Sequence, residues 1–376
     1  MDERFYSIVL SCIPGIGPAH ARHLITAMGS AQAIFEQKAE LKDRFPTMNK
    51  KMADSLSCPN AFLRAEEEMK FIEKNQIRCL TMQDEDYPSR LRECDDAPIV
   101  LFYRGKADMN APKVITMVGT RRATSYGQDI CSHFLSDLST FLPDLLVVSG
   151  LAYGIDVSAH RNALRAGLPT IGVLAHGLDR IYPAAHRQIA ADMLARGGLL
   201  TDYPSGTNPA RENFLLRNRL IAALADATVV VESAERGGAL STAAHARSYG
   251  RSVFAVPGRA TDEHSAGCLH LIARGRAELI TSAADLCQLM GWTQTGTLSD
   301  ATNRSAHPSA SLRPPVASVP LPDNAVTRVL LAEGATQIND LARLSDLSVR
   351  EVMAVLFDLE MDGLVTTLPG GVYKLV

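Results

Sequence analysis

Between residues 113 and 290, short apolar runs alternate with segments long enough to form helices, and this rhythm constrains the fold more than any other feature. The runs are rich in Val, Ile and Leu and lack polar alternation, which is typical of strands buried on both faces. The pattern therefore predicts a doubly wound, mostly parallel α/β sheet. The runs lie at Val114–Val118, Leu145–Val148, Thr170–Leu174, Leu199–Thr201, Thr228–Val231, Ser252–Val256 and Glu278–Ile280.

The predicted strands nearly all end in loops that contain glycine. In open α/β sheets, ligands bind beyond the carboxyl ends of the strands. We therefore expect the functional site along that edge of the sheet. The loop glycines are Gly119, Gly150, Gly177, Gly206, Gly237 and Gly258.

The chain of 376 residues is too long for one ordinary domain. Residues 1–112 predict a helical module and a connector, and residues 113–292 the α/β domain. The segment 13–25 has the form of a helix-hairpin-helix, which could offer backbone N–H groups to a phosphate or could simply pack as an αα-hairpin. Residues 293–322 have the Ser-, Thr-, Ala- and Pro-rich composition of a linker. Residues 323–376 predict two helices, a turn and a hairpin, which is a winged helix-turn-helix.

Bulk properties exclude several protein classes. No apolar run is long enough to cross a bilayer, and the first residues lack the order of a secretory signal, so we expect a cytoplasmic protein without a membrane partner. The seven cysteines form no C-x-x-C pair, which favours reduced thiols and no metal site. The net charge of −3 gives no overall indication of nucleic-acid binding. Any such site must be local.

Arginines gather where the predicted strands end. The stretch 113–290 holds 16 Arg and one Lys against 15 Asp and Glu, so position matters more than net charge. Arginine binds phosphate with a planar fork and stays charged, although each of these residues could instead be a solvated surface group. We expect them to be exposed and to converge on a polyanion. They are Arg121, Arg122, Arg217, Arg219 and Arg236.

Two further features support a binding site for phosphates and bases. Gly150 and Gly154 flank a loop before a helix, as in a phosphate loop, but the spacing fits neither a dinucleotide fingerprint nor a Walker A motif, so no cofactor is expected. Phe214 lies between Arg211 and Arg217 in the sequence. Its ring could stack on a base, which contributes ~1–3 kcal/mol, or it could belong to the core.

Catalytic arrangements are weakly supported. Asp156 and His160 lie four residues apart on one predicted helix, and Ser149 is not in a G-x-S-x-G elbow, so a hydrolase triad is not expected. We expect Asp156 to cap its helix or to pair with a neighbouring arginine. Glu232 follows a buried strand and precedes paired glycines, as does the base of nucleotide N-glycosidases of the lysine-decarboxylase-like group. Their P-G-G-x-G-T loop is absent here, and that enzyme remains the alternative to a non-catalytic protein.

The order of the motifs resembles the DNA-processing protein A family (DprA, also called Smf). The resemblance covers essentially the whole chain and implies a SAM-like or helix-hairpin-helix-like N-terminal module, an extended Rossmann-like domain and a winged helix. The motifs are Val118-Gly-Thr-Arg-Arg122, Ser149-Gly-Leu-Ala-Tyr-Gly-Ile-Asp156 with His160, Thr201-Asp-Tyr-Pro204, Arg217-Asn-Arg219, Arg236-Gly-Gly-Ala-Leu240, Ala255-Val-Pro-Gly258 and Gly267-Cys268.

The resemblance implies a protein that binds single-stranded DNA and hands it to the recombinase RecA in natural transformation or recombination. It places Arg121 and Arg161 in the binding pocket and the Arg217-Asn-Arg219 motif beside them. With the residues above, the predicted DNA-binding set is Gly119, Arg121, Arg122, Ser149, Gly150, Gly154, Arg161, Phe214, Arg217, Asn218, Arg219 and Arg236.

The resemblance also implies a homodimer, with the contact near the Gly267-Cys268 turn. We expect the apolar residues Leu269, Leu271 and Ile272 to form that surface, unless they are ordinary helix core. The sequence departs from the family pattern here, because Leu269 stands where an asparagine is usual.

The predicted winged helix could make the chain a transcriptional regulator. Residues 323–376 hold four Arg and Lys against eight Asp and Glu, whereas DNA readers need positive charge directed at phosphates. The presumed recognition helix, 348–360, offers only Arg350 against three carboxylates. We therefore expect a protein-interaction or regulatory module and keep the regulator as an alternative.

Overall fold

The computed structural model describes residues 2–37, 41, 45, 50–292, 322–362, 364–368 and 372–375. It divides into two compact units, Met1–Gln294 and Thr295–Val376. The predicted linker lies outside the described part except for residue 322, and Gly363 and residues 369–371 of the predicted hairpin lie entirely outside it. No helix within the described residues is long and apolar enough to cross a membrane.

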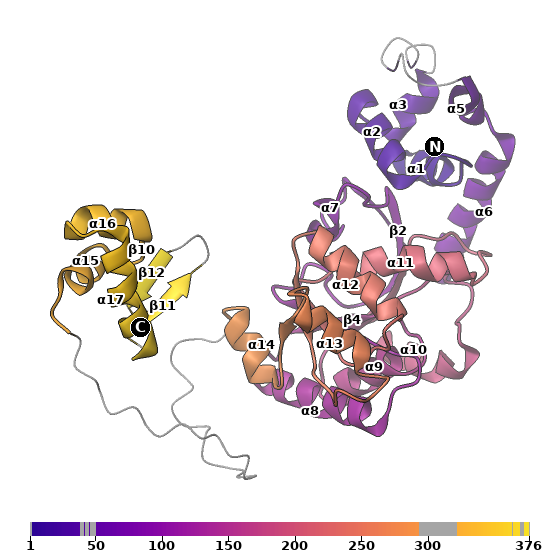
Figure 1. Ribbon diagram of the computed structural model, residues 1–376. Helices are drawn as coiled ribbons and strands as arrows, with labels where there is room; N and C mark the ends of the chain where they lie inside the picture. The colour runs from indigo at the N-terminus through magenta and orange to yellow at the C-terminus, as the bar shows by residue number, and fades with distance from the viewer. Residues whose placement is uncertain are drawn as a thin grey trace. The chain divides into compact units, whose positions relative to one another are not determined.

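The N-terminal part of the first unit is helical, as Figure 1 shows. Ile8, Leu10, Leu24 and Ile34 are buried in a core shared by its helices. The predicted hairpin is formed by α1 and α2, whose second helix begins with a proline that is pre-organised for a helix start. Phosphate binding by its turn stays a prediction. The helices are α1 (Glu3–Ser11), α2 (Pro18–Met28), α3 (Ala31–Glu36), α5 (Lys50–Ser55) and α6 (Pro59–Asn75).

A nine-stranded sheet forms the centre of the unit, in the order β1-β2-β6-β5-β4-β3-β7-β8-β9. The strands from β6 to β9 in this order are mutually parallel, which confirms the predicted doubly wound sheet. All seven predicted strands are present. They are β3 (Val114–Val118), β4 (Leu146–Ser149), β5 (Thr170–Val173), β6 (Gly198–Thr201), β7 (Ala227–Val230), β8 (Ser252–Ala255) and β9 (Glu278–Leu279).

Two strands of the sheet were not predicted. They are β1 (Arg78–Thr81) and β2 (Val100–Gly105), which the sequence analysis assigned to the helical module and its connector. β2 pairs antiparallel with β6, and β1 pairs antiparallel with β2. The short α7 (Ser89–Arg92) lies between them in the chain. Residues 78–105 therefore extend the sheet, and the domain boundary at residue 112 stays a prediction.

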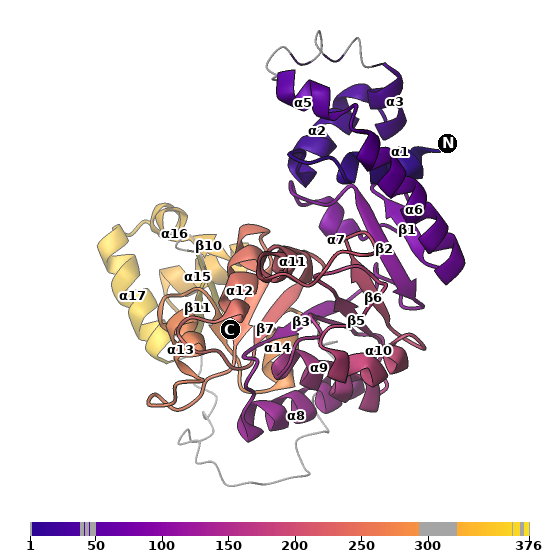
Figure 2. The ribbon, with the colours of Figure 1, turned by 90° about the vertical axis from the view of Figure 1, so that its right-hand side faces the viewer.

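Helices cover both faces of the sheet, because alternate residues of each strand point to opposite faces. Ile115 and Met117 of β3 pack with α8 and α9, whereas Val114 and Val118 pack with α11 and α12. Figure 2 shows these two helix pairs on opposite sides of the strands. The remaining helices are η1 (Ala184–His186), α10 (Arg187–Met193), α13 (Ala266–Ala273) and α14 (Ala283–Leu289), and the four named above are α8 (Ser125–Phe141), α9 (Ile155–Arg165), α11 (Arg211–Ala223) and α12 (Gly238–Ser248).

The winding direction reverses at β3. The chain passes from β3 through β4 and β5 to β6 on one side, and then returns to place β7, β8 and β9 on the other side. Such a switch point leaves a crevice between the loops that follow β3 and β7, the strands on either side of the reversal, and ligands of doubly wound proteins bind there. The topology therefore selects the carboxyl ends of β3 and β7, together with that of β4, which lies next to β3.

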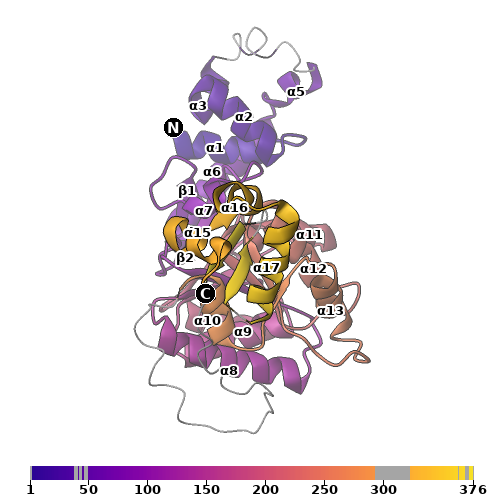
Figure 3. The ribbon, with the colours of Figure 1, turned by 60° about the vertical axis from the view of Figure 1, so that its left-hand side comes forward.

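The second unit is a winged helix, as predicted. Val326, Leu330, Leu341, Val352 and Leu356 form its small core. Asn324 and Ser348 begin α15 and α17 with capping boxes, in which the side chain at the helix start and the side chain three residues later each satisfy a backbone N–H. Figure 3 shows its helices α15 (Ala325–Glu333), α16 (Ile338–Ser345) and α17 (Val349–Met361). Its sheet has the strand order β10 (Thr336–Gln337), β12 (Val372–Leu375), β11 (Val365–Leu368), and these strands are labelled in Figure 1.

Candidate functional site

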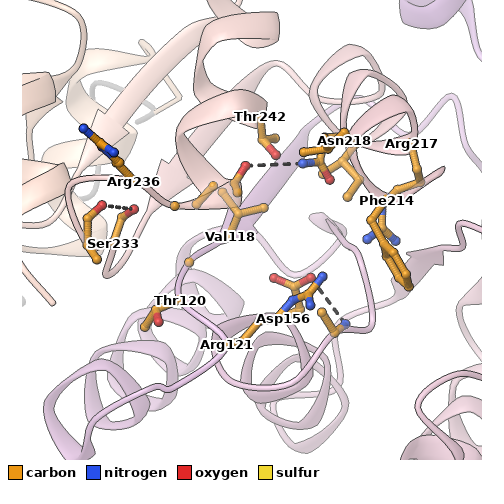
Figure 4. Close-up of a pocket in the computed structure, with 18 residues that line it drawn as sticks. Val118, Thr120, Arg121, Asp156, Phe214, Arg217, Asn218, Ser233, Arg236 and Thr242 are labelled. Atoms are coloured by element: carbon orange, nitrogen blue, oxygen red, sulfur yellow. Dashed lines mark hydrogen bonds between the residues drawn. The ribbon is translucent and has the colours of Figure 1, made fainter. Parts of the chain in front are cut away.

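A cavity of about 280 Å³ opens at the switch point, at the carboxyl ends of β3, β4 and β7 and along α11 from Phe214 to Ile221 (Figure 4). We call it the switch-point pocket. Its wall brings together six of the residues predicted to bind DNA, from the loops after β3 and β7 and from α11. They are Gly119, Arg121, Phe214, Arg217, Asn218 and Arg236.

Glycines allow the loop after β3 to contact the loop after β4. Gly154 has a positive φ of 77°, and a Cβ atom on it would lie 2.1 Å from the carbonyl oxygen of Thr120. A Cβ on Gly119 would lie 2.4 Å from the side chain of Ile155. The backbone N–H of Ile155 donates to Thr120 at 3.2 Å. Both glycines thus permit the loop after β3 to rest on the start of α9.

Arg217 forms part of the floor of the pocket and is not exposed as predicted. Only 3% of the residue is accessible, and its guanidinium donates to the carbonyl oxygens of Gly150, at 2.8 Å, and of Val173. Burial lowers the pKa of Arg217 to about 10, a change that the nearby carboxylate of Asp156 opposes. Burial also raises the pKa of Asp156, against the charge of Arg217. The predicted pairing of Asp156 with a neighbouring arginine agrees with this arrangement.

The Arg217-Asn-Arg219 motif is divided between two sites, contrary to the expectation of one anion-binding edge. Asn218 faces the switch-point pocket and donates to the carbonyl oxygen of Gly238 at 3.3 Å (Figure 4). Arg219 is buried on another side of α11, where it donates to Asp202 at 2.7 Å. That side lines a separate cavity of about 250 Å³. Successive helical residues differ by about 100° in direction, which separates the two arginines.

The exposed cations of the predicted set are Arg121, Arg122, Arg161 and Arg236. Among these, Arg121 and Arg236 line the switch-point pocket, whereas Arg122 and Arg161 do not. The guanidinium of Arg121 lies 5.3 Å from the ring centre of Phe214, and that of Arg217 lies 5.8 Å from it. The half-buried Phe214 ring therefore stands between one exposed and one buried arginine.

Ser149 is fully buried, so its side chain is not exposed for contact with DNA. Its hydroxyl donates to the carbonyl oxygen of Met117 at 2.6 Å. His160 is also buried, and its Nδ1 lies 2.7 Å from the hydroxyl of Thr170. Burial lowers the pKa of His160 to about 3. These contacts place the serine hydroxyl and the imidazole in separate structural hydrogen bonds, which fits the expectation that they form no triad.

Glu232 holds a helix start and does not face the pocket. Its carboxylate accepts from the backbone N–H of Thr124, at 3.0 Å, and from the hydroxyl of the same residue. Thr124 caps α8, and the residue Glu232 is only 1% exposed. A Cβ on Gly127 would lie 2.2 Å from this carboxylate. The geometry gives Glu232 a structural role at the start of α8, outside the lining of the switch-point pocket.

The predicted dimer segment lies on α13. Leu271 is buried in the core beneath α12, which agrees with the alternative of ordinary helix core, and the dimer surface stays a prediction. Leu269 and Ile272 are half-buried. A Cβ on Gly267 would lie 2.4 Å from the carbonyl oxygen of Ala234, which ties the start of α13 to the loop after β7.

Sequence reasoning missed Tyr182, whose ring centre lies 5.8 Å from that of Phe214. Tyr182 lies in the loop after β5, so the rule that ligands bind at strand ends could have found it if it had been applied to aromatic residues. Within the described residues, no cluster of three or more His, Cys, Asp or Glu side chains could hold a metal ion.

The chain matches two family models. Residues 78–291 match the model of DNA recombination-mediator protein A, and residues 311–371 match that of the DprA winged helix domain. The chain is 31% identical to Protein Smf of a Synechocystis species, over 99% of each chain.

Two solved structures resemble the model. DNA processing protein A of Streptococcus pneumoniae is 30% identical, with a TM-score of 0.60 over 77% of this chain and 98% of that one. DNA processing protein A of Helicobacter pylori, which is described as having a unique single-stranded DNA binding mode, is 28% identical. Its TM-score is 0.52 over 58% of this chain and 96% of that one.

Proposed function

The chain belongs to the DprA/Smf family of DNA-processing proteins, and from that membership we propose that it binds single-stranded DNA in the switch-point pocket and delivers it to RecA. In this proposal the protein is a recombination mediator without catalytic activity. It acts in the cytoplasm, as a homodimer, during natural transformation or recombination. The H. pylori relative, with its single-stranded DNA binding mode, supports the choice of ligand.

One observation carries the proposal. Two exposed arginines, Arg121 and Arg236, line a pocket at the switch point of a doubly wound sheet, with the half-buried ring of Phe214 beside them. Guanidinium groups bind phosphates without regard to sequence, and an aromatic ring can stack on any base. A site that contacts phosphates and the faces of bases, and not the hydrogen-bonding edges of bases, is suited to DNA strands of arbitrary sequence.

The buried residues of the predicted set support the site in another way. Gly119, Gly150 and Gly154 let the loops after β3 and β4 approach the start of α9, and Arg217 links the ends of β4 and β5 through two carbonyl groups. We propose that they shape the pocket, while Arg121 and Arg236 contact phosphates. Arg122 and Arg161 are exposed and could extend the contact outside the pocket.

A mobility-shift comparison of single-stranded and double-stranded DNA of equal length tests the ligand. We expect a shift of the single strand at lower protein concentration than of the duplex. RecA in a parallel lane should give a further shift of the complex if the protein delivers the strand. Equal binding of both DNA forms, or release of free adenine from AMP, would contradict the proposal.

A further inference from the structure

Two half-exposed tyrosines continue the switch-point pocket along the edge of the sheet. Tyr153 lies in the loop after β4 and Tyr182 in the loop after β5, and each is 49% exposed. Ala152, which precedes Tyr153, lines the pocket, and the ring of Tyr182 packs near that of Phe214, which also lines it. The two tyrosines are therefore adjacent to the pocket and outside its arginine-lined part.

Neighbouring rings hold both tyrosines. The ring of Tyr153 lies 4.9 Å from that of His186, at a near-perpendicular angle of 68°. His186 is buried, and its Nδ1 lies 2.8 Å from the carbonyl oxygen of Leu151. The ring of Tyr182 lies 5.8 Å from that of Phe214, at an angle of 50°. Both rings are thus supported on one side and open to solvent over about half of their surface.

Strand order separates the rings from the cations. Across the sheet the relevant strands run β5-β4-β3-β7. Tyr182 and Tyr153 follow β5 and β4, whereas Arg121 and Arg236 follow β3 and β7. We call the side with the two tyrosines the aromatic half and the side with Arg121 and Arg236 the cationic half; they meet where the Arg121 guanidinium lies 5.3 Å from the ring centre of Phe214. The aromatic half also holds the exposed Arg180, whose charge is paired with Asp179 at 2.7 Å.

We propose that the aromatic half discriminates single strands from duplexes. Phosphates are present in both forms of DNA, so the arginines attract both. The faces of the bases are free only in a single strand, because a duplex stacks them on each other. Tyr153 and Tyr182 can accept bases from a single strand that enters the arginine-lined pocket. This inference rests on the proposed function and assigns the choice of strand form to two residues.

The test compares binding of an oligothymidine and of a duplex to a Tyr153→Ala, Tyr182→Ala double variant by fluorescence anisotropy. The strand should be about as long as one such site, roughly 10 nucleotides. We expect the affinity for the single strand to fall by about tenfold or more. The weaker affinity for the duplex should be unchanged. Replacement of both tyrosines by phenylalanine should retain the wild-type affinity, since the ring faces remain.

Phe141→Ala provides a matched control. Phe141 is 45% exposed at the end of α8, and α8 starts at the carboxyl edge of the sheet and ends at the opposite edge. Its loss should change neither affinity. A second test uses the wild-type protein and changes the DNA instead. An abasic strand, whose nucleotides lack bases, should bind about tenfold more weakly than oligothymidine of the same length.

The outcomes separate this inference from the proposed function. If the folded double variant binds oligothymidine with wild-type affinity, or if the abasic strand binds the wild type as well as oligothymidine does, the inference is wrong. An equal loss of affinity for strand and duplex would also overturn it. The proposed function would survive these results as long as the wild type still prefers the single strand and Arg121→Ala weakens binding. Absence of any single-strand binding by the wild type would instead remove the proposed function.

Discussion

Burial separates Arg121 from Arg217, although the sequence predicts the same role for both. Arg121 is exposed and lies over one side of Phe214, whereas Arg217 is buried and spends its donors on Gly150 and Val173. An exposed guanidinium can exchange water for a phosphate. The buried guanidinium of Arg217 already donates to two carbonyl groups and lies near the carboxylate of Asp156, so its removal should affect mainly the stability of the fold.

Replacing Arg121 by alanine should weaken the binding of unrelated single strands about equally. The slope of log affinity against log salt should become shallower by ~0.7, the value for one phosphate contact on a single strand. Circular dichroism should not change, because an exposed side chain contributes little to the core. Arg104→Ala is the control, since Arg104 is exposed on β2 near the other edge of the sheet and should leave the salt slope as it is. A wild-type slope for Arg121→Ala would place the phosphate contacts elsewhere.

Replacing Arg217 by alanine should instead lower the free energy of unfolding, by about 3 kcal/mol or more. The change leaves the carbonyl groups of Gly150 and Val173 without their donor and the carboxylate of Asp156 without its buried counter-charge. Urea denaturation measures this loss. An unchanged midpoint together with weakened DNA binding would show that Arg217 acts on the ligand directly.

His160 should make the first unit less stable in mild acid. Burial lowers its pKa from 6.5 to about 3, so the unfolded chain binds a proton between these pH values and the folded protein does not. The free energy of unfolding is therefore not reduced by protonation of His160 above about pH 6.5, and it falls as the pH is lowered from there towards 3. At pH 5 the loss should be about 2 kcal/mol. The variant His160→Asn retains a hydrogen-bond partner for Thr170 and should remove this part of the pH dependence. Urea denaturation at pH 7 and pH 5 measures the difference in the free energy of unfolding. The same pH dependence in the variant and the wild type would contradict the role of His160.

At the scale of elements, the contact between the β3 loop and α9 depends on glycine. Gly154→Ala would force a side chain into a left-handed backbone and against Thr120, so it should destabilise the protein by about 1–3 kcal/mol and weaken strand binding. Gly238→Ala is the matched control for stability alone, because a Cβ there meets nothing within 4 Å at the start of α12, although Gly238 lines the switch-point pocket. It should leave the melting temperature equal or slightly higher. Equal effects of the two changes would contradict the role of the interlocked loops.

The sequence predicts the parallel strands well because burial on both faces removes polar residues from them, as in Val114–Val118. β1 and β2 escaped prediction because they follow a long helix and a turn-rich segment, and β2 joins the sheet by pairing with β6, about a hundred positions away, while β1 pairs only with β2. Nothing local marks such a pairing.

The switch-point pocket opens at the edge of the sheet where the sequence predicts the site, because strand-end glycines mark that edge, but the placement of single residues differs from the prediction. The side of α11 on which each arginine falls decides between Arg217 in the pocket floor and Arg219 beside Asp202. Helical geometry alone could have separated the two, since they are two residues apart on one helix. Their burial could not be read from the sequence, because it depends on loops that arrive from β4, β5 and β6.

At the scale of the whole molecule, the surface of the winged helix differs from that of a DNA reader. Its α17 exposes Val349, Met353 and Phe357, which recur every four residues on one side of the helix, and Phe357 is 63% exposed. Arg350 is the one basic residue of this helix, whose sequence also holds Glu351, Asp358 and Glu360. Apolar and acidic groups repel a phosphate backbone or leave it without partners.

Removal of residues from Thr295 onward should therefore leave single-strand affinity nearly intact. The first unit contains the sheet, its helices and the switch-point pocket, and it has hydrophobic cores of its own, so it should fold without the second unit. Anisotropy with oligothymidine should give a dissociation constant within about tenfold of that of the full chain, a difference below ~1.4 kcal/mol. The comparison requires that the truncated protein melts cooperatively and has the same oligomeric state in sedimentation. A larger loss in such a protein would mean that the winged helix contacts the strand despite its acidic, apolar α17, and the pocket would then be only part of the binding surface.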